Sequence, residues 1–185
     1  MSFVVDNTTY QIYTTELQHI ASTLKGMGPF EAVRELRPFD LATIANLSGV
    51  TSIGPTGATS TTSIVPGAYG VTIAPGATAQ ISFRVQPGFG FAFFGWISDL
   101  DLGPSGTLQI IVDSVVRQEV MNRVAYDNPQ KKVYLLDQVV FVKQGSQVTL
   151  QATNSGAATV SGTLWPLAYI GGTKSALQIS GTGAG

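Results

Sequence analysis

The sequence predicts an all-β fold: a single eight-stranded jelly-roll β-sandwich preceded by an N-terminal arm with one to three short helices. Apolar and polar residues alternate with a period of two along much of residues 69–170, which is typical of antiparallel strands with one buried and one wet face. Turns rich in Gly, Pro and Asn separate about eight such segments at roughly ten-residue spacing. No helical pattern comes between them, and eight strands favour a jelly roll over an immunoglobulin-type sandwich.

Length and composition limit how the chain is organised. Its 185 residues suffice for one core and an appendage. We therefore expect an N-terminal arm over 1–50, a Gly/Thr/Ser-rich loop over 51–68, a jelly-roll domain over 69–170 and a flexible tail over 171–185. The N-terminus shows no signal-peptide pattern. No apolar run approaches the length of about 18 residues that a membrane-spanning helix needs.

The charge of the chain is low in amount and close to balanced. Charged residues make up 11% of the sequence, against roughly 25% in an ordinary soluble protein. The net charge of −1 and the absence of a basic patch exclude nucleic acid as a specific partner. The absence of cysteine excludes disulfides, thiolate zinc sites and cysteine nucleophiles.

The N-terminal arm is expected to begin extended and then to form a helix. Residues 1–13 read as an extended segment that can add a short strand. Thr15 followed by Gln18 matches a capping box and starts a helix predicted over 16–25. The apolar stripe of this helix consists of Leu17, Ile20 and Leu24.

Two further short helices are predicted before the loop. Pro29 suits the first position of a helix over 30–37, which Pro38 then ends. Asp40 is a candidate cap for a third short helical segment that reaches residue 47.

The strands follow from the alternation of side chains. We expect strands at 69–74, 79–86, 91–98, 107–112, 115–121, 134–142, 147–153 and 160–165, with a last segment at 167–170. The strands at 147–153 and 160–165 read as a hairpin, with Thr149, Gln151, Thr163 and Trp165 on its polar face. That face contains Thr, Ser and Gln but no charge, whereas a free surface normally mixes charged residues into such a face.

The strand at 91–98 is apolar on both faces. We place Phe91 and Phe93 on one face and Phe94 and Trp96 on the other. A strand of this kind is covered on both sides. The sandwich core is one cover, and the second could be the N-terminal helices, a neighbouring subunit or a sugar stacked on the aromatic rings.

A search for catalytic constellations finds none that the spacing supports. His19 is the only histidine, so the two or three imidazoles of a zinc site are missing, and no G-x-S-x-G motif accompanies it. Asp99 and Asp101 alternate across a turn, where solvation of the loop is the simplest interpretation. A bound Ca²⁺ or a glycosidase pair at these carboxylates is the alternative. We expect no enzymatic activity, no catalytic residue, no cofactor and no metal site.

Two long uncharged segments predict contacts between copies of the chain. Residues 41–83 and 144–173 carry no charged side chain. Hydroxyls and amides cost less to desolvate than ions, and interface cores are depleted in charge. We therefore expect a homo-oligomer, a dimer or larger. The candidate interface residues are Phe94, Trp96, Thr149, Gln151, Thr163, Trp165, Leu17, Ile20 and Leu24.

The strand pattern also carries a resemblance to a known family. With its aromatic strand at 87–98, its hairpin at 107–121 and its strand pair at 139–165, the chain resembles the single jelly-roll capsid proteins of icosahedral viruses. It is similar in size and texture to the small major capsid protein of tailless, internal-membrane-containing phages of thermophiles. The resemblance implies a non-enzymatic subunit that stands upright in the shell and packs as dimers or higher multimers. It also implies a second capsid protein as partner and a contact with the internal viral membrane. The chain would then reside in the virion, and in the host cytoplasm during assembly.

Two other functions fit the same pattern. A carbohydrate- or receptor-binding jelly-roll module of a phage fibre or decoration protein would use aromatic side chains and Thr/Asn-rich loops. A sandwich hydrolase is the weaker option. Saturable binding to sugars would favour the module, and a dimer or larger species in solution would favour the capsid subunit.

Overall fold

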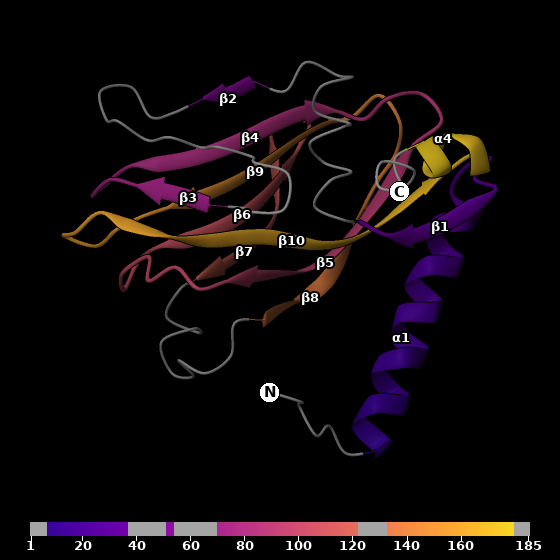
Figure 1. The fold of residues 1–185 in the computed structure, drawn as a ribbon, viewed down its shortest axis with the longest axis horizontal. Helices are drawn as coiled ribbons and strands as arrows, with labels where there is room; N and C mark the ends of the chain where they lie inside the picture. The colour runs from indigo at the N-terminus through magenta and orange to yellow at the C-terminus, as the bar shows by residue number, and fades with distance from the viewer. Residues whose placement is uncertain (1–6, 37–50, 54–69, 122–132, 180–185) are drawn as a thin grey trace.

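The computed structural model describes residues 7–36, 51–53, 70–121 and 133–179 (Figure 1). Its helices are α1 (Asn7–Gly26) and α4 (Lys174–Ile179). Its strands are β1 (Ala32–Glu35), β2 (Thr51–Ile53), β3 (Gly70–Ile73), β4 (Thr78–Arg84), β5 (Gly90–Ser98), β6 (Thr107–Val112), β7 (Val115–Met121), β8 (Val133–Val142), β9 (Gln147–Thr153) and β10 (Val160–Gly172).

The strands form two packed antiparallel sheets. In the first, here called the β5 sheet, the order is β1-β10-β5-β8, and β3 pairs with the other half of β10. In the second, the β9 sheet, the order is β2-β4-β9-β6-β7. Four strand pairs nest inside one another, as in a long hairpin folded into a sandwich: β3–β10, β4–β9, β5–β8 and β6–β7. The predicted eight-stranded jelly roll is confirmed, with β1 and β2 as additional edge strands.

The main core lies between the two sheets and follows the predicted alternation. The inward residues of β9, namely Val148, Leu150 and Ala152, are each 5% exposed or less. Phe83 and Phe91 meet edge to face across the core with ring centroids 5.6 Å apart. Burying a side chain of this size stabilises the fold by about 1.5–3 kcal/mol. The sandwich therefore depends on the apolar faces that the alternation identifies.

A β-bulge in β5 changes the predicted faces of its aromatic residues. Phe94 has no strand partner in the registry with β8, which shifts between Phe93 and Gly95. The extra residue turns the rest of the strand over. Trp96 therefore joins Phe91 and Phe93 in the main core, whereas Phe94 faces α1. The prediction that Phe94 and Trp96 share a face is wrong.

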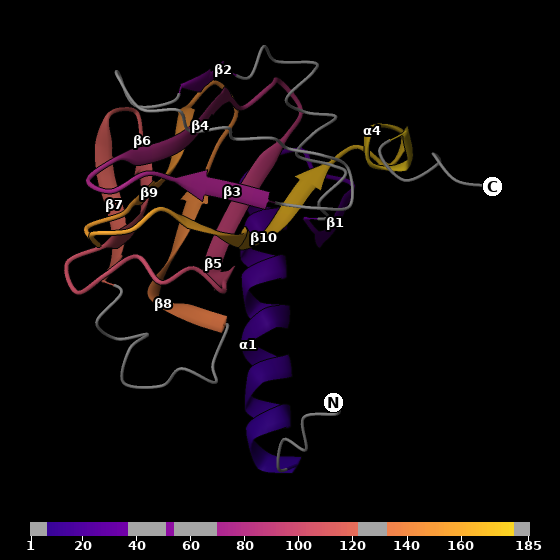
Figure 2. The ribbon, with the colours of Figure 1, turned by 60° about the vertical axis from the view of Figure 1, so that its left-hand side comes forward.

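Helix α1 lies across the outer face of the β5 sheet and continues beyond it (Figures 1 and 2). Ile20 and Leu24 are buried in a second apolar cluster with Phe94, and Leu17 packs against it. This cluster supplies the second cover of β5, so the N-terminal helix is the correct choice among the three covers considered. The helix starts at Asn7 and not at residue 16, so the prediction of an extended segment is wrong over residues 7–13.

The segment after α1 is a strand where a helix was predicted. β1 pairs with the end of β10, from Ala32 opposite Gly172 to Glu35 opposite Tyr169. Phe30, just before it, is buried. An added Cβ at Gly28, Gly90 or Gly171 would lie 2.6–2.9 Å from its ring. Tertiary packing of this ring and pairing with β10 override the local helical pattern at 30–37.

The C-terminal end of the described chain is ordered into secondary structure. β10 runs to Gly172, and α4 follows, with Thr173 Oγ1 accepting the N–H of Ala176 at 3.2 Å. Arg34 Nη2 donates to the carbonyl of Leu177 at 3.2 Å and so ties α4 to β1. The expected flexible tail is therefore strand and helix up to Ile179. The third helix predicted over 40–47 lies outside the described residues.

Strands β9 and β10 do not form the predicted hairpin. β9 pairs with β4 and β6, whereas β10 pairs with β5, β3 and β1, so the connection crosses from one sheet to the other. Asn154 is fully buried in this connection. Its side-chain nitrogen lies 3.0, 3.2 and 2.9 Å from the carbonyl oxygens of Ile73, Ala74 and Ala158. This amide joins the start of the crossing to the end of β3.

Candidate functional site

The outward face of the β9 sheet is an array of hydroxyl and amide groups, here called the polar face. It comprises Thr78, Gln80 and Ser82 of β4, Thr149, Gln151 and Thr153 of β9, Thr107 and Gln109 of β6, and Glu119 of β7. Ile111 of β6, opposite Thr149, is an apolar member of the same face. Side chains that lie opposite one another on adjacent strands form rows across the sheet. One such row consists of Gln80, Gln151, Gln109 and Glu119.

Hydrogen bonds between strands connect these side chains. The hydroxyls of Ser82 and Thr149 are 2.7 Å apart, and those of Thr78 and Thr153 are 3.1 Å apart. Gln151 Nε2 donates to Gln109 Oε1 at 3.1 Å. The amide of Gln109 in turn donates to the carboxylate of Glu119. Each hydrogen bond restricts the rotamers of the two side chains that it joins.

The polar face is nearly free of charge. Within β4, β9 and β6 the only ionisable side chain is Arg84, at the end of β4, where its Nε donates to the carbonyl of Gly145 at 2.9 Å. Covering this face therefore desolvates neutral groups, most of which already have a hydrogen-bond partner. That costs far less free energy than burying ions.

The predicted interface residues divide between this face and the interior. Thr149 and Gln151 lie half-buried on the polar face. Thr163 lies in β10, opposite Gly70 in the other sheet, and its side chain is outside the described part of the structure. Thr149 and Thr163 thus do not share a face, and that prediction is wrong because β9 and β10 belong to different sheets.

The aromatic and helical residues of the predicted interface lie inside the subunit. Phe94, Trp96, Trp165, Ile20 and Leu24 are each 8% exposed or less. They pack within one chain, so we withdraw them from the candidate contact surface. Leu17 is half-buried at the margin of the α1 cluster. Its contact with another copy stays a prediction.

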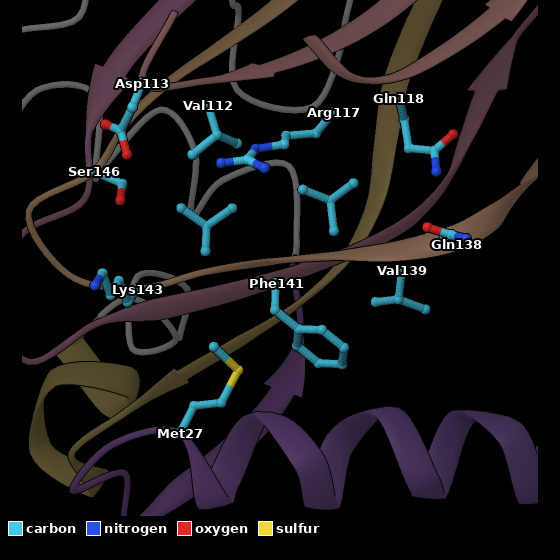
Figure 3. Close-up of a pocket in the computed structure, with 12 residues that line it drawn as sticks. Met27, Val112, Asp113, Arg117, Gln118, Gln138, Val139, Phe141, Lys143 and Ser146 are labelled. Atoms are coloured by element: carbon cyan, nitrogen blue, oxygen red, sulfur yellow. The ribbon is translucent and has the colours of Figure 1, made fainter. Parts of the chain in front are cut away.

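A second feature is a pocket of about 450 Å³ between the edges of the two sheets (Figure 3). Residues 138–143 of β8 and its following turn form one wall, and Arg117 and Gln118 of β7 face them. Arg117 is the unpaired residue of a bulge between Ile110 and Ile111 of the neighbouring strand β6. Met27, directly after α1, lies beside Phe141 on the outer side of the pocket.

The mouth of this pocket carries Asp113, Arg117 and Lys143. The pKa of Asp113 lies below its ordinary value because its Oδ1 accepts the backbone N–H of Gln147 at 2.9 Å. The side chain of Ser146 and the charges of Arg117 and Lys143 lower this pKa further. The side chains of Arg117 and Lys143 form no hydrogen bond or ion pair with any residue that the structure describes, and both are exposed.

Sequence reasoning missed Arg117 and Lys143 as site residues. The bulge adds one residue to β7, and no distinctive residue type marks its position in the sequence. The alternation of residues 115–121 therefore does not predict that Arg117 lines the pocket. Lys143 reads as an ordinary turn residue. It becomes a candidate site residue only because it follows β8, which lies at the edge of its sheet.

The candidate catalytic and metal residues do not converge. His19 is exposed on α1. Asp99 and Asp101 are exposed, and Asp101 Oδ1 accepts the N–H of Gly103 at 3.2 Å, which is turn chemistry. Across the described ranges, no three His, Cys, Asp or Glu side chains gather where they could hold a metal ion. In the same part of the chain, neither helix combines the length and the apolar character needed to cross a membrane.

Three carbohydrate-related chains are among the solved structures to which this chain is weakly similar. No protein-family model matches the sequence, and no curated protein matches it. The CBM36-1 domain of a multidomain xylanase from the hindgut metagenome of Trinervitermes trinervoides is 9% identical, with a TM-score of 0.29 over 66% of this chain and 97% of that one. A Paenibacillus sp. cycloisomaltooligosaccharide glucanotransferase complexed with cycloisomaltoheptaose is 17% identical, with a TM-score of 0.30 over 64% of this chain and only 16% of that one.

The third structure is the carbohydrate-binding module CBM36 in complex with calcium and xylotriose. It is 8% identical, with a TM-score of 0.24 over 65% of this chain and 97% of that one. All three TM-scores lie below 0.5, so these similarities carry no argument about function.

Proposed function

We propose that this chain is a structural subunit that assembles with further copies of itself, as its resemblance to single jelly-roll capsid proteins implies. The observation that carries the proposal is the polar face. Its part on β4, β9 and β6 carries no ionisable side chain except Arg84, Glu119 of β7 lies at its margin, and its hydroxyls and amides bond to one another across the strands. A sister molecule can cover such a face at low desolvation cost.

The projecting part of α1 supports the same proposal. A helix of 20 residues is about 30 Å long, whereas the described side chains of α1 that pack on the β5 sheet, from Leu17 to Leu24, extend over only about 10 Å of it. Short helices without tertiary packing are marginal in water. The part that runs clear of both sheets in Figures 1 and 2 is therefore suited to a contact with another copy.

The capsid role would make the subunit non-enzymatic and place it in a virion beside a second capsid protein. Assembly on the polar face is tested with Gln80→Lys plus Thr149→Lys, which puts two charges on that face. The matched control is Ala157→Lys plus Thr159→Lys, two exposed loop positions outside it. Sedimentation velocity should show multimers for the wild type and the control and a large loss for the first variant. Equal multimers in both variants would remove the polar face as a contact.

A second candidate function is carbohydrate binding on the same face. Rows of fixed hydroxyl and amide groups such as Gln80, Gln151 and Gln109 match the hydrogen-bonding groups of a neutral sugar. Trp96 and Trp165 are buried and offer no stacking platform. Saturable binding on a glycan array, lost in Gln80→Lys plus Thr149→Lys but kept in the loop control, would favour this function over assembly.

A further inference from the structure

The β5 sheet ends in two strands that each have one unpaired edge among the described residues. β8 pairs only with β5, and β1 pairs only with β10. An unpaired edge presents free N–H and C=O groups that can accept another strand. The two edges lie at opposite ends of the same sheet, so one copy offers both halves of a possible joint.

The strand directions allow these edges to join in a regular way. β1, β10, β5 and β8 are successively antiparallel, so β1 and β8 of one chain run in opposite directions. A second copy placed beside the first in the same orientation therefore brings its β1 antiparallel to β8. Pairing continues the sheet without turning either subunit over.

Continuing the rows of the sheet gives the register of this joint. Glu35, Tyr169, Ala92 and Phe141 lie in one row. If the row continues, Glu35 of the second copy lies opposite Phe141. Val33 of that copy then lies opposite Lys143, two residues further on. Its Glu31 and Glu35 are the diagonal neighbours of Lys143 on the same face.

The charges on the two edges are complementary in this register. Lys143 and Arg117 lie at the β8 edge. Glu31, just before β1, and Glu35, the last residue of β1, lie at the other edge, and all four residues are exposed. Glu31 Oε2 also accepts the backbone N–H of Lys174 at 2.9 Å within the same chain. A twofold pairing of β8 with β8 centred near Lys143 would instead bring Lys143 and Arg117 against the same cations of the other copy. Electrostatics therefore favours the contact between unlike edges.

The pocket beside β8 provides room for the incoming strand. It follows residues 138–143, which are the length of the segment Glu31 to Leu36. Met27, 43% exposed at its outer side, gives an apolar surface for the strand to cover. Figure 3 shows Arg117 extending over the pocket from the opposite wall.

We propose that copies of this chain join head to tail by adding β1 of one subunit to β8 of the next, with Lys143 between Glu31 and Glu35 of the neighbour. This inference rests on the proposed function, since it names one contact of the assembly. A contact between unlike surfaces closes into a ring or continues as a filament, according to the rotation between neighbours. It is separate from the polar face, which belongs to the other sheet.

Charge reversal tests the joint. Lys143→Glu and Glu35→Lys should each weaken association by about tenfold through like-charge repulsion. The double variant with both changes should recover most of it. An equimolar mixture of the two single variants should also form multimers, because every contact between unlike copies then pairs one acid with one base. Sedimentation velocity at low and high salt measures each sample, since screening reduces the differences.

The outcomes separate this inference from the function on which it rests. A wild-type chain that stays monomeric would overturn both. Multimers that persist unchanged in Lys143→Glu, while Gln80→Lys plus Thr149→Lys dissolves them, would overturn the edge joint alone. Weak association in both single variants with no recovery in the double variant would also overturn it, because the charges would then not face each other.

Discussion

The hydroxyl groups of Ser82 and Thr149 lie 2.7 Å apart across β4 and β9, on the face of the sandwich that carries almost no charge. The two residues are direct partners in the strand register, so one donates and the other accepts. The pair shows how the polar face is built. Neighbouring strands satisfy each other's side chains, and the surface needs little water to hold its arrangement.

The Ser82–Thr149 bond should appear as a coupling in a double-mutant cycle. We expect Ser82→Ala and Thr149→Val each to lower the free energy of unfolding by about 0.5–1 kcal/mol. The double variant should lose less than the sum of the two. Urea denaturation measures the three variants, and strict additivity would show that the hydroxyls do not interact in solution.

The projecting part of α1 should contribute to assembly and little to the stability of the subunit. Removing residues 1–14 leaves Leu17, Ile20 and Leu24, the described side chains that pack on the β5 sheet. We expect the unfolding temperature of the monomer to change by only a few degrees, about the effect of 1 kcal/mol in a domain of this size. Light scattering should show smaller multimers. Unchanged multimers would mean that this part of the helix touches no neighbour.

The buried amide of Asn154 should be among the most sensitive positions of the fold. Its nitrogen lies within 3.2 Å of three carbonyl oxygens, and its oxygen accepts the N–H of Gly156 at 2.8 Å. Asn154→Ala removes all four of these hydrogen bonds at a fully buried position, although the carbonyl of Ala74 keeps the N–H of Ala77, and the loss should cost about 2–4 kcal/mol. Ser155→Ala, at the exposed neighbouring position, should cost about 1 kcal/mol or less. Urea midpoints measure both, and equal losses would contradict the role assigned to the amide.

The sequence predicts the sandwich because its signal is local and repeated. Val148, Leu150 and Ala152 alternate with polar residues, and the period of two alone determines which of them are inward. The uncharged outer face of the same strand is equally visible, so Thr149 and Gln151 could be placed on a surface without coordinates. These parts of the candidate site follow from the sequence.

Other parts depend on contacts that no local pattern records. The bulge at Phe94 turns Trp96 into the core, and the bulge at Arg117 aims that residue at a pocket. Phe30 is fixed by the close approach of glycines from distant strands, which converts a predicted helix into β1. The edge positions of β1 and β8 emerge only from the strand order. The proposed joint was therefore invisible in the sequence.

Protonation of Asp113 should weaken the β6–β7 hairpin at low pH. Asp113 and Ser114 occupy the two-residue turn with φ of 51° and 66°, and the carboxylate accepts the N–H of Gln147. Because the folded pKa lies below the ordinary aspartate value of 3.8, the ionised form stabilises the fold above that value. The contribution is lost as pH falls from about 4 through the folded pKa.

Asp113→Asn isolates this charge, since asparagine keeps an acceptor oxygen and tolerates positive φ. We expect the wild type to unfold at a higher temperature than Asp113→Asn at pH 6. The two should converge as the pH approaches 2. A constant difference between the variants across this range would mean that the carboxylate charge does not stabilise the turn.

Because Phe30 and Gly90 are in close contact, Phe30→Leu should partly suppress the loss of stability that Gly90→Ala causes. A Cβ at Gly90 would lie 2.6 Å from the Phe30 ring and 3.3 Å from the carbonyl oxygen of Val142. Gly90→Ala should therefore lower the free energy of unfolding by about 1–3 kcal/mol through overpacking. Phe30→Leu removes the ring atoms that the new methyl group meets. The double variant should then lose less free energy of unfolding than the sum of the losses in the two single variants. Urea denaturation of the four proteins measures this coupling. Additive losses would show that the backbone at Val142, and not the ring, sets the limit at Gly90.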